Sequence, residues 1–508
     1  MASHENGHID MNDNMNTHFT CGIRQMKSPF TLLLLCMVLY SAFFALVSKA
    51  EMIWFDEAFS LMSCSHSCLD LWEYSRIDIH MPTYHYILKA WQFLFGSSIC
   101  SAKLLSLLVT MLSTIVVYCL CKKIDSSKFG MQCALAYMLF PGVCSNATEI
   151  RMYALTGFCV IVATYFLMEI VNEPPRFKDY CFFSLSLLFS MALLNASVVF
   201  VATLSILLTV LLLLKKDAKK CMYGILSIVA TGVLYSPILF SRLVAQCNNV
   251  KNDFWTSRLS IGDAFYVFVS QYLGRGHLRQ LCFAYFFIIW SISLIGIFFI
   301  LKNDDAKRKR MILICLACIS MPMIFGAIAS LILGRLVLIG RAMYPTIVFL
   351  VILHVYSIRA LPWKTLRWIA CCVLSIMFLN QVGSLLFSMR HTRHCEMQRL
   401  LSKTYKNVPV ICFLQSFAMP ISCYLPDRTI YIDKTFEDAD SCLPLNANMR
   451  LKSLNVVNEK TLLCIASNRV SEEIESYFGK YNFKLRLVDS WEHEYSKMTY
   501  CLFEANRN

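Results

Sequence analysis

Long apolar stretches, separated by short polar connections, fill most of the first 390 residues of this chain. A bilayer core about 30 Å thick needs about 20 apolar residues per helix, so each such stretch is expected to cross a membrane. The pattern predicts about eleven spans, near residues 29–48, 100–121, 129–146, 152–171, 180–195, 197–214, 221–240, 282–301, 311–333, 342–358 and 368–389. The first is too long for the apolar core of a signal peptide, so we expect it to be retained.

The composition agrees with a membrane protein. Hydrophobic residues make up 57% of the 508 positions and charged residues 16%, against about 25% charged in soluble domains. These values exclude a water-soluble enzyme, a disordered chain and a nucleic-acid-binding protein. The net charge of +14 does not change this interpretation, because most Lys and Arg residues lie in short connections between apolar stretches, where they orient membrane helices.

The distribution of basic residues predicts the topology. One set of alternate connections contains 19 Lys and Arg residues, and the opposite set contains 11 in a much longer sequence. Because the basic side faces the cytoplasm, the N-terminus is predicted to be cytoplasmic. We therefore divide the chain into a cytoplasmic tail (1–28), a membrane domain (29–389) whose first extracytoplasmic loop is 49–99, and an extracytoplasmic domain (390–508).

The C-terminal region differs from the rest of the chain. Short β-rich runs, with a helical stretch at Ser471 to Tyr481, predict a small α/β domain. The expected strands are Val408 to Leu414, Thr429 to Asp433, Thr461 to Ser467, Lys484 to Asp489 and Thr499 to Phe503. Its six cysteines leave disulfide pairing open. We expect the domain to be accessory, in acceptor recognition or in capping the helices.

Charged residues at helix ends mark the candidate site. Asp56 and Glu57 follow the first span directly, and ionisable groups at such a depth are costly and usually functional. The alternative is a solvated acidic helix start, which the helix dipole also favours. On the same predicted face lie three further groups, which are Asp78 with His80, Glu149 with Arg151 and Tyr153, and Arg335 with Arg341 and Tyr344. Taken alone, Arg341 also fits an arginine that reaches lipid phosphates.

The order of these motifs resembles a known family. Trp54-x-Asp56-Glu57-Ala58, Asp78-x-His80-x-Pro82, Glu149-x-Arg151-x-Tyr153 and Arg341-x-x-Tyr344-Pro345 are similar to the motifs of GT-C polytopic glycosyltransferases, in the bacterial branch of the protein O-mannosyltransferase and aminoarabinose transferase superfamily. Met81 stands where the family has a first proline, and two residues separate Arg341 from Tyr344. The resemblance implies an α-helical polytopic GT-C-like fold over residues 30–390.

The implied reaction moves a sugar from a polyprenyl-phosphate donor to a hydroxyl or amine of a glycan, lipid or protein acceptor. Asp56 is the candidate base, with Glu57 second, and a single displacement inverts the anomeric centre. Arg151 and Arg341 suit the departing phosphate because guanidinium pairs bidentately with it, and Lys89 and Arg335 are reserves. Asp78, His80, Glu149, Tyr153 and Tyr344 are candidate substrate contacts. The sequence indicates no definite cofactor, and a divalent metal is left open because Asp78 and His80 alone are a weak metal signal.

Two other interpretations remain open at this stage. A lipid or glycolipid transporter would also have many spans, but it should show inverted repeats and helices broken near the midplane, which the sequence does not show. A purely structural membrane protein would leave the motif spacing to chance. The loop near 241–281 is either a mobile lid or an aromatic membrane anchor. The resemblance alone places the protein in a bacterial inner membrane with its site facing the periplasm.

Overall fold

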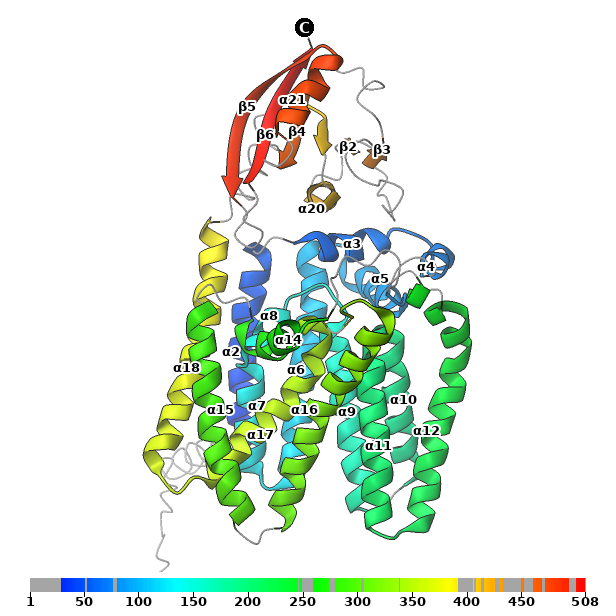
Figure 1. Ribbon diagram of the computed structural model, residues 1–508, viewed down its shortest axis with the longest axis vertical. Coiled ribbons are helices and arrows are strands. Elements are labelled where there is room, and N and C mark those ends of the chain that lie inside the picture. Colours follow the sequence, from blue (N-terminus) through cyan, green and yellow to red (C-terminus); the bar gives the residue numbers. More distant parts are fainter. Residues whose placement is uncertain are drawn as a thin grey trace, which may run out of the picture.

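The computed structural model shows a helical bundle with a small sheet beyond one end (Figure 1). In the helical part it describes residues 29–50, 53–75, 80–174, 176–244, 246–248, 259–274, 279–302, 306–337 and 339–391. In the C-terminal part it describes 405, 408–412, 415–424, 429–432, 449–451, 460–467, 471–492 and 499–507.

Nine helices in the described part are long and apolar enough to cross a membrane. They are α2 (Pro29–Ala50), α6 (Ile99–Ile124), α9 (Tyr153–Asn172), η1 with α11 (Asn195–Ser197 and Val198–Leu214), α12 (Ala218–Ile238) with the π-turn η2 (Leu239–Leu243), α15 (Arg279–Lys302), α16 (Ala306–Leu333), η3 with α17 (Gly340–Thr346 and Ile347–Ala360), and α18 (Lys364–His391). Each matches a predicted span, so the prediction of a multi-pass membrane protein is confirmed.

The two other expected spans form shorter helices. Helix α10 covers Phe177–Leu193, which is about 26 Å at 1.5 Å per residue. The stretch 129–146 is not continuous, because α7 (Ser127–Met138) ends before Pro141 and a separate helix, α8 (Pro141–Asn146), begins there. Proline at the first position of a helix is favourable because its missing N–H needs no partner there. The predicted count of about eleven spans is therefore not confirmed.

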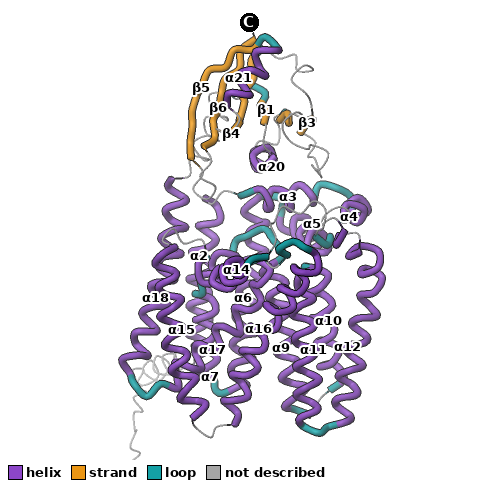
Figure 2. Tube along the Cα trace, viewed as in Figure 1, coloured by secondary structure: helices purple, strands orange, loops and turns teal. Residues whose placement is uncertain are grey.

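Short helices cover the end of the bundle nearest the sheet, as Figure 2 shows in purple. The first long loop forms α3 (Phe55–Ser63), α4 (Cys68–Tyr74) and α5 (Thr83–Phe95), and the later loop forms α14 (Ile261–Leu273). Three parts of that later loop, 245, 249–258 and 275–278, lie outside the described residues, and the lid predicted near 241–281 is therefore described only in part. These short helices, with the turn between α8 and α9, hold the residues discussed below.

The C-terminal region contains the predicted α/β domain. Its strands are β1 (Val410–Cys412), β2 (Ile430–Ile432), β3 (Met449–Leu451), β4 (Thr461–Ser467), β5 (Phe483–Glu492) and β6 (Thr499–Arg507), in the sheet order β3-β2-β1-β4-β6-β5. The first four are parallel, and β6 is antiparallel to β4 and β5. Five strands and helix α21 (Ser471–Lys480) match the prediction, whereas β3 was not predicted.

Both faces of the sheet are buried at strands β1, β2 and β4. Side chains alternate along a strand, so Ile411 and Cys464 pack under α21, while Val410 and Cys412 face the opposite way. Helix α20 (Gln415–Tyr424) lies on that second face, between the sheet and α3. The four cysteines of this region that the structure describes, Cys412, Cys423, Cys464 and Cys501, are free thiols. The other two, Cys395 and Cys442, lie outside the described residues.

Candidate active site

The start of α3 is held by Glu57. Its Oε2 accepts a hydrogen bond from the Trp54 amide at 3.1 Å. Glu57, the third residue of α3, therefore caps the backbone N–H of Trp54, the residue that precedes the helix. Its Oε1 accepts from the Ile150 amide at 2.9 Å, which ties α3 to the turn before α9. The side chain is only 2% exposed, and burial raises the pKa of the Glu57 carboxyl against the opposing effect of Lys103. Both carboxylate oxygens are thus occupied by backbone donors.

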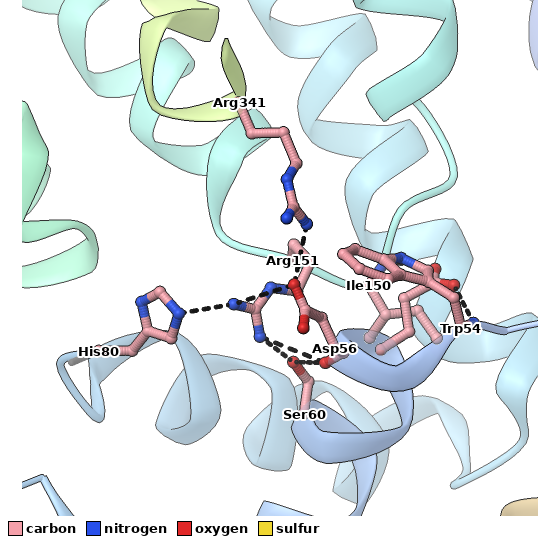
Figure 3. A network of polar contacts seen from close by, with 8 residues as sticks. Trp54, Asp56, Ser60, His80, Ile150, Arg151 and Arg341 are labelled. Atoms are coloured by element: carbon pink, nitrogen blue, oxygen red, sulfur yellow. Dashed lines mark hydrogen bonds and ion pairs between the residues drawn. The ribbon is translucent and has the colours of Figure 1, made fainter. Parts of the chain in front are cut away.

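Arg151, in the turn before α9, contacts α3 and is 3% exposed. Its Nη1 donates to the Asp56 carbonyl and to the Ser60 hydroxyl, each at 3.2 Å. Its Nη2 lies 2.8 Å from His80 Nε2 (Figure 3). Guanidinium only donates, so Nε2 accepts and the proton of His80 is on Nδ1. Burial, with the Arg151 charge as the next cause, holds the pKa of His80 well below its usual range, which keeps the ring neutral.

Arg341 approaches Asp56 from the other side. It lies on η3, and its Nη1 is 2.8 Å from Asp56 Oδ2. Its guanidinium carbon is 4.5 Å from the centre of the Trp54 ring and 5.9 Å from that of Tyr153. A cation held against two aromatic rings is oriented as well as attracted. The Arg341 side chain is 34% exposed, so this cation is accessible to a ligand.

The Asp56 carboxylate lies at the centre of these contacts. Its Oδ2 is 2.8 Å from Arg341 and 3.9 Å from Nη2 of Arg151, and the side chain is 23% exposed. Asp56 therefore combines two nearby positive charges with a side open to solvent. This arrangement suits a group that exchanges a proton with a bound molecule, because it has both accessibility and a fixed orientation.

Glu149 is a second buried acid in the same region. Its backbone oxygen accepts from the Arg151 amide at 2.8 Å, which shapes the turn before α9. Burial raises the pKa of the Glu149 carboxyl to about 7, although Arg341 and Arg151 act in the opposite direction. Glu57 and Asp56 add to the increase, because three carboxyl groups occupy a small volume. Glu149 therefore titrates near neutral pH.

A cavity of about 640 Å³ opens beside Arg341. Its walls come from α8, α14 and the segment that leads into η3, and they are polar as well as apolar. The lining residues are Gly142, Ser145, Asn146, Asp263, Tyr266, Val267, Ser270, Gln271, Gly274, Leu336, Ile339, Gly340 and Arg341. Within it, Gln271 Nε2 donates to the Gly340 carbonyl at 2.6 Å and so fixes the start of η3. Arg341 thus connects the Asp56 cluster with this cavity.

The other predicted residues lie in different places. Lys89 donates to the His66 carbonyl, and Arg335 lies between α16 and η3 and does not line the cavity. Tyr344 is buried in the bundle, where its hydroxyl is 3.2 Å from that of Tyr137. Its ring occupies the space beside Gly157, where a Cβ would come within 2.5 Å of it. Asp78 lies outside the described residues.

Sequence reasoning did not single out three residues of this region, which are Ser60, Lys103 and Gln271. Ser60 follows Asp56 by four residues, so helical spacing alone places both on the same side of α3. Lys103 is fully buried in α6, and a cation inside an apolar span is a strong functional signal. Gln271 carries no comparable sequence signal. Among the described residues, no group of three His, Cys, Asp or Glu side chains is placed to hold a metal ion.

Comparison with solved structures identifies the fold. No family model and no curated protein matches the sequence. ArnT from Cupriavidus metallidurans in the apo state matches with a TM-score of 0.62 and 11% identity over 93% of this chain and 97% of that one. The same protein bound to undecaprenyl phosphate gives a TM-score of 0.59 and 10% identity over the same shares. The resemblance inferred from four short motifs is therefore confirmed at the level of architecture: the chain has the GT-C fold of ArnT.

Proposed function

We propose that this protein is a membrane glycosyltransferase that moves a sugar from a polyprenyl-phosphate carrier to an acceptor hydroxyl or amine. The observation that carries the proposal is Asp56 placed between Arg341 and Arg151, at 2.8 and 3.9 Å, with Arg341 in the wall of a cavity. A base next to fixed cations is what displacement of a phosphate requires. The ArnT structure with undecaprenyl phosphate supports the class of donor.

In the proposed reaction the acceptor oxygen or nitrogen attacks C1 of the sugar. The bond from C1 to the phosphate oxygen breaks, its electron pair leaves with the polyprenyl phosphate, and Asp56 accepts the acceptor proton. A correctly placed base contributes about 10²–10⁴-fold to such a step. One displacement inverts the anomeric centre. Glu57 holds two backbone amides, so we assign it to anchoring α3.

The charge that grows on the leaving phosphate needs donors that are already oriented. Arg341 meets this need because its guanidinium is held against Trp54 and Tyr153 and still borders the cavity. We therefore place the donor phosphate at Arg341, on the cavity side. Fixed cations in a poorly hydrated site stabilise such charge by several kcal/mol. Arg151 adds a second positive charge near Asp56. Its hydrogen bonds to the Asp56 carbonyl and the Ser60 hydroxyl keep α3 in place.

The remaining residues receive supporting roles. We assign Tyr153 to the orientation of Arg341, His80 to the orientation of Arg151, and Glu149 to the charge balance of the site. Tyr344 is assigned to packing against α9 and α7. Lys89 and Arg335 remain reserve candidates for binding the donor phosphate. The location proposed from the sequence is the inner membrane of a bacterium, with this end of the bundle facing the periplasm.

The test uses the full chain in nanodiscs with undecaprenyl-phosphate sugars as donors. Mass spectrometry follows the release of undecaprenyl phosphate, and NMR of the product gives the anomeric configuration. Asp56→Asn should abolish transfer, while the control Asp70→Asn, which alters an exposed cap on α4, should retain it.

Release of undecaprenyl phosphate that Asp56→Asn leaves unchanged would contradict the proposed base. In sealed proteoliposomes, movement of intact lipid-linked sugar across the bilayer, with no cleavage, would instead support a transporter.

A further inference from the structure

Helix α20 connects the C-terminal sheet to the helix that carries Asp56. It follows β1 directly and lies over α3, as Figure 1 shows near the junction of sheet and bundle. Apolar packing is continuous across this junction. The buried cluster that contains Val410 and Ile430 of the sheet also contains Met419 of α20 and Ala58 and Met62 of α3. The sheet is therefore packed on the membrane domain rather than tethered to it.

Three consecutive residues at the end of α20 contact α3 and its approach. The Ile53 amide donates to the Tyr424 hydroxyl at 2.9 Å. The Cys423 thiol lies 4.0 Å from the Ala58 carbonyl, and the Ser422 hydroxyl lies 3.7 Å from the sulfur of Met62. Of these, the bond from Ile53 is the strongest, because thiol and thioether groups are weak hydrogen-bonding partners.

The position of Ile53 gives this bond its importance. Ile53 is buried and immediately precedes Trp54, whose amide is held by Glu57 and whose ring contacts Arg341. Asp56 lies in the first turn after it. The Tyr424 hydroxyl therefore fixes the chain at the point where it enters α3. A buried backbone N–H must have a partner, so loss of this hydroxyl should let the entry shift.

We propose that Tyr424 is a positioning residue through which the C-terminal domain holds Asp56 against Arg341. The proposal rests on the transferase function proposed above. Tyr424 touches neither cation in the described contacts and acts through Ile53 and Trp54. A displacement of about 1 Å in reacting groups can cost 10²-fold in rate, so a small shift of α3 should lower kcat without removing the donor cavity.

The test compares Tyr424→Phe with Tyr405→Phe. Tyr405 lies in the same domain, and its hydroxyl is 3.5 Å from Glu504, so the control removes a hydroxyl that does not contact α3. We expect Tyr424→Phe to lower kcat about tenfold, with KM for the donor changed less than twofold. Amide exchange, followed by mass spectrometry, should become faster in peptides covering residues 53–62 and stay unchanged in those covering α21.

The exchange measurement separates this proposal from the proposed function, because it needs no turnover. Unchanged exchange at 53–62 in Tyr424→Phe would overturn the positioning role. So would an equal loss of kcat in Tyr405→Phe, which would indicate general damage to the domain. If the wild-type protein transfers no sugar but Tyr424→Phe still loosens 53–62, the proposed function fails and the structural connection stands.

Discussion

Oδ2 of Asp56 and Nη1 of Arg341 are separated by 285 positions in sequence and by 2.8 Å in space. Asp56 comes from the first turn of α3, after the first span, and Arg341 from η3, at the start of a late span. Because Trp54 lies against the same guanidinium, the entry of α3 and the start of η3 are fixed to each other. The site therefore exists only when the two ends of the membrane domain are assembled.

Replacing Arg341 by lysine should show whether the shape of this cation matters. Lysine keeps the charge, but it loses the planar donors and the broad contact with Trp54 and Tyr153. We expect Arg341→Lys to lower kcat/KM about 10²-fold, because oriented donors at a developing charge contribute that much. The control is Arg359→Lys, at the ion pair of Arg359 with Asp125. Equal activity of the two variants would argue against a phosphate at Arg341.

Two variants of His80 distinguish the role of its hydrogen bond to Arg151 from the role of its imidazole ring. Its Nε2 accepts from Arg151, and glutamine has an oxygen that does the same. Alanine leaves that buried donor without this acceptor, which costs about 1–3 kcal/mol. We expect His80→Ala to lower both the thermal midpoint and kcat, and His80→Gln to restore most of each. Equal loss in both variants would instead indicate that the ring itself binds substrate.

Glu57 should behave as an anchor when it is changed to glutamine. Its two oxygens accept from the amides of Trp54 and Ile150, and glutamine offers one acceptor and one donor in their place. One buried amide then faces an N–H group, so stability should fall by about 1–3 kcal/mol. The check is kcat per mole of folded protein, which should stay within a few-fold of wild type. A loss comparable to that of Asp56→Asn would restore Glu57 as a base.

Periodicity and hydropathy were sufficient to predict most of the architecture. A span needs only apolar length, so nine expected helices are present, and short runs of β-forming residues located five of the six strands. The exceptions have local causes. Pro141 divides one stretch into α7 and α8. Strand β3 is as short as β1 and β2, but its sequence Met-Arg-Leu contains no β-branched or aromatic residue.

The site could be predicted only in part, because the sequence gives the type of each residue but not the residues that it contacts in the fold. The charges of Asp56, Arg151 and Arg341 stand out at helix ends. Tyr344 belongs to the same motif as Arg341, but its ring turns into the core beside Gly157, which no pattern in the sequence indicates. Gln271 donates to the backbone carbonyl of Gly340. Every residue has such a carbonyl, so the contact depends on the fold and not on the type of the partner residue.

Glu149→Gln should change how stability depends on pH. The pKa of this carboxyl is about 7 in the folded protein, against an ordinary value of 4.5. Between these values the unfolded chain loses the proton and the folded chain keeps it, so the wild type is progressively destabilised as pH rises through this interval. The effect should reach about 3 kcal/mol above pH 7 and be absent below pH 4.5, where both states are protonated. Glutamine does not titrate, so the thermal midpoint of the variant should rise relative to wild type from pH 4.5 to 7 and then remain constant. A difference in midpoint that does not vary with pH would show that Glu149 is ionised throughout, with its charge balanced by Arg341 and Arg151.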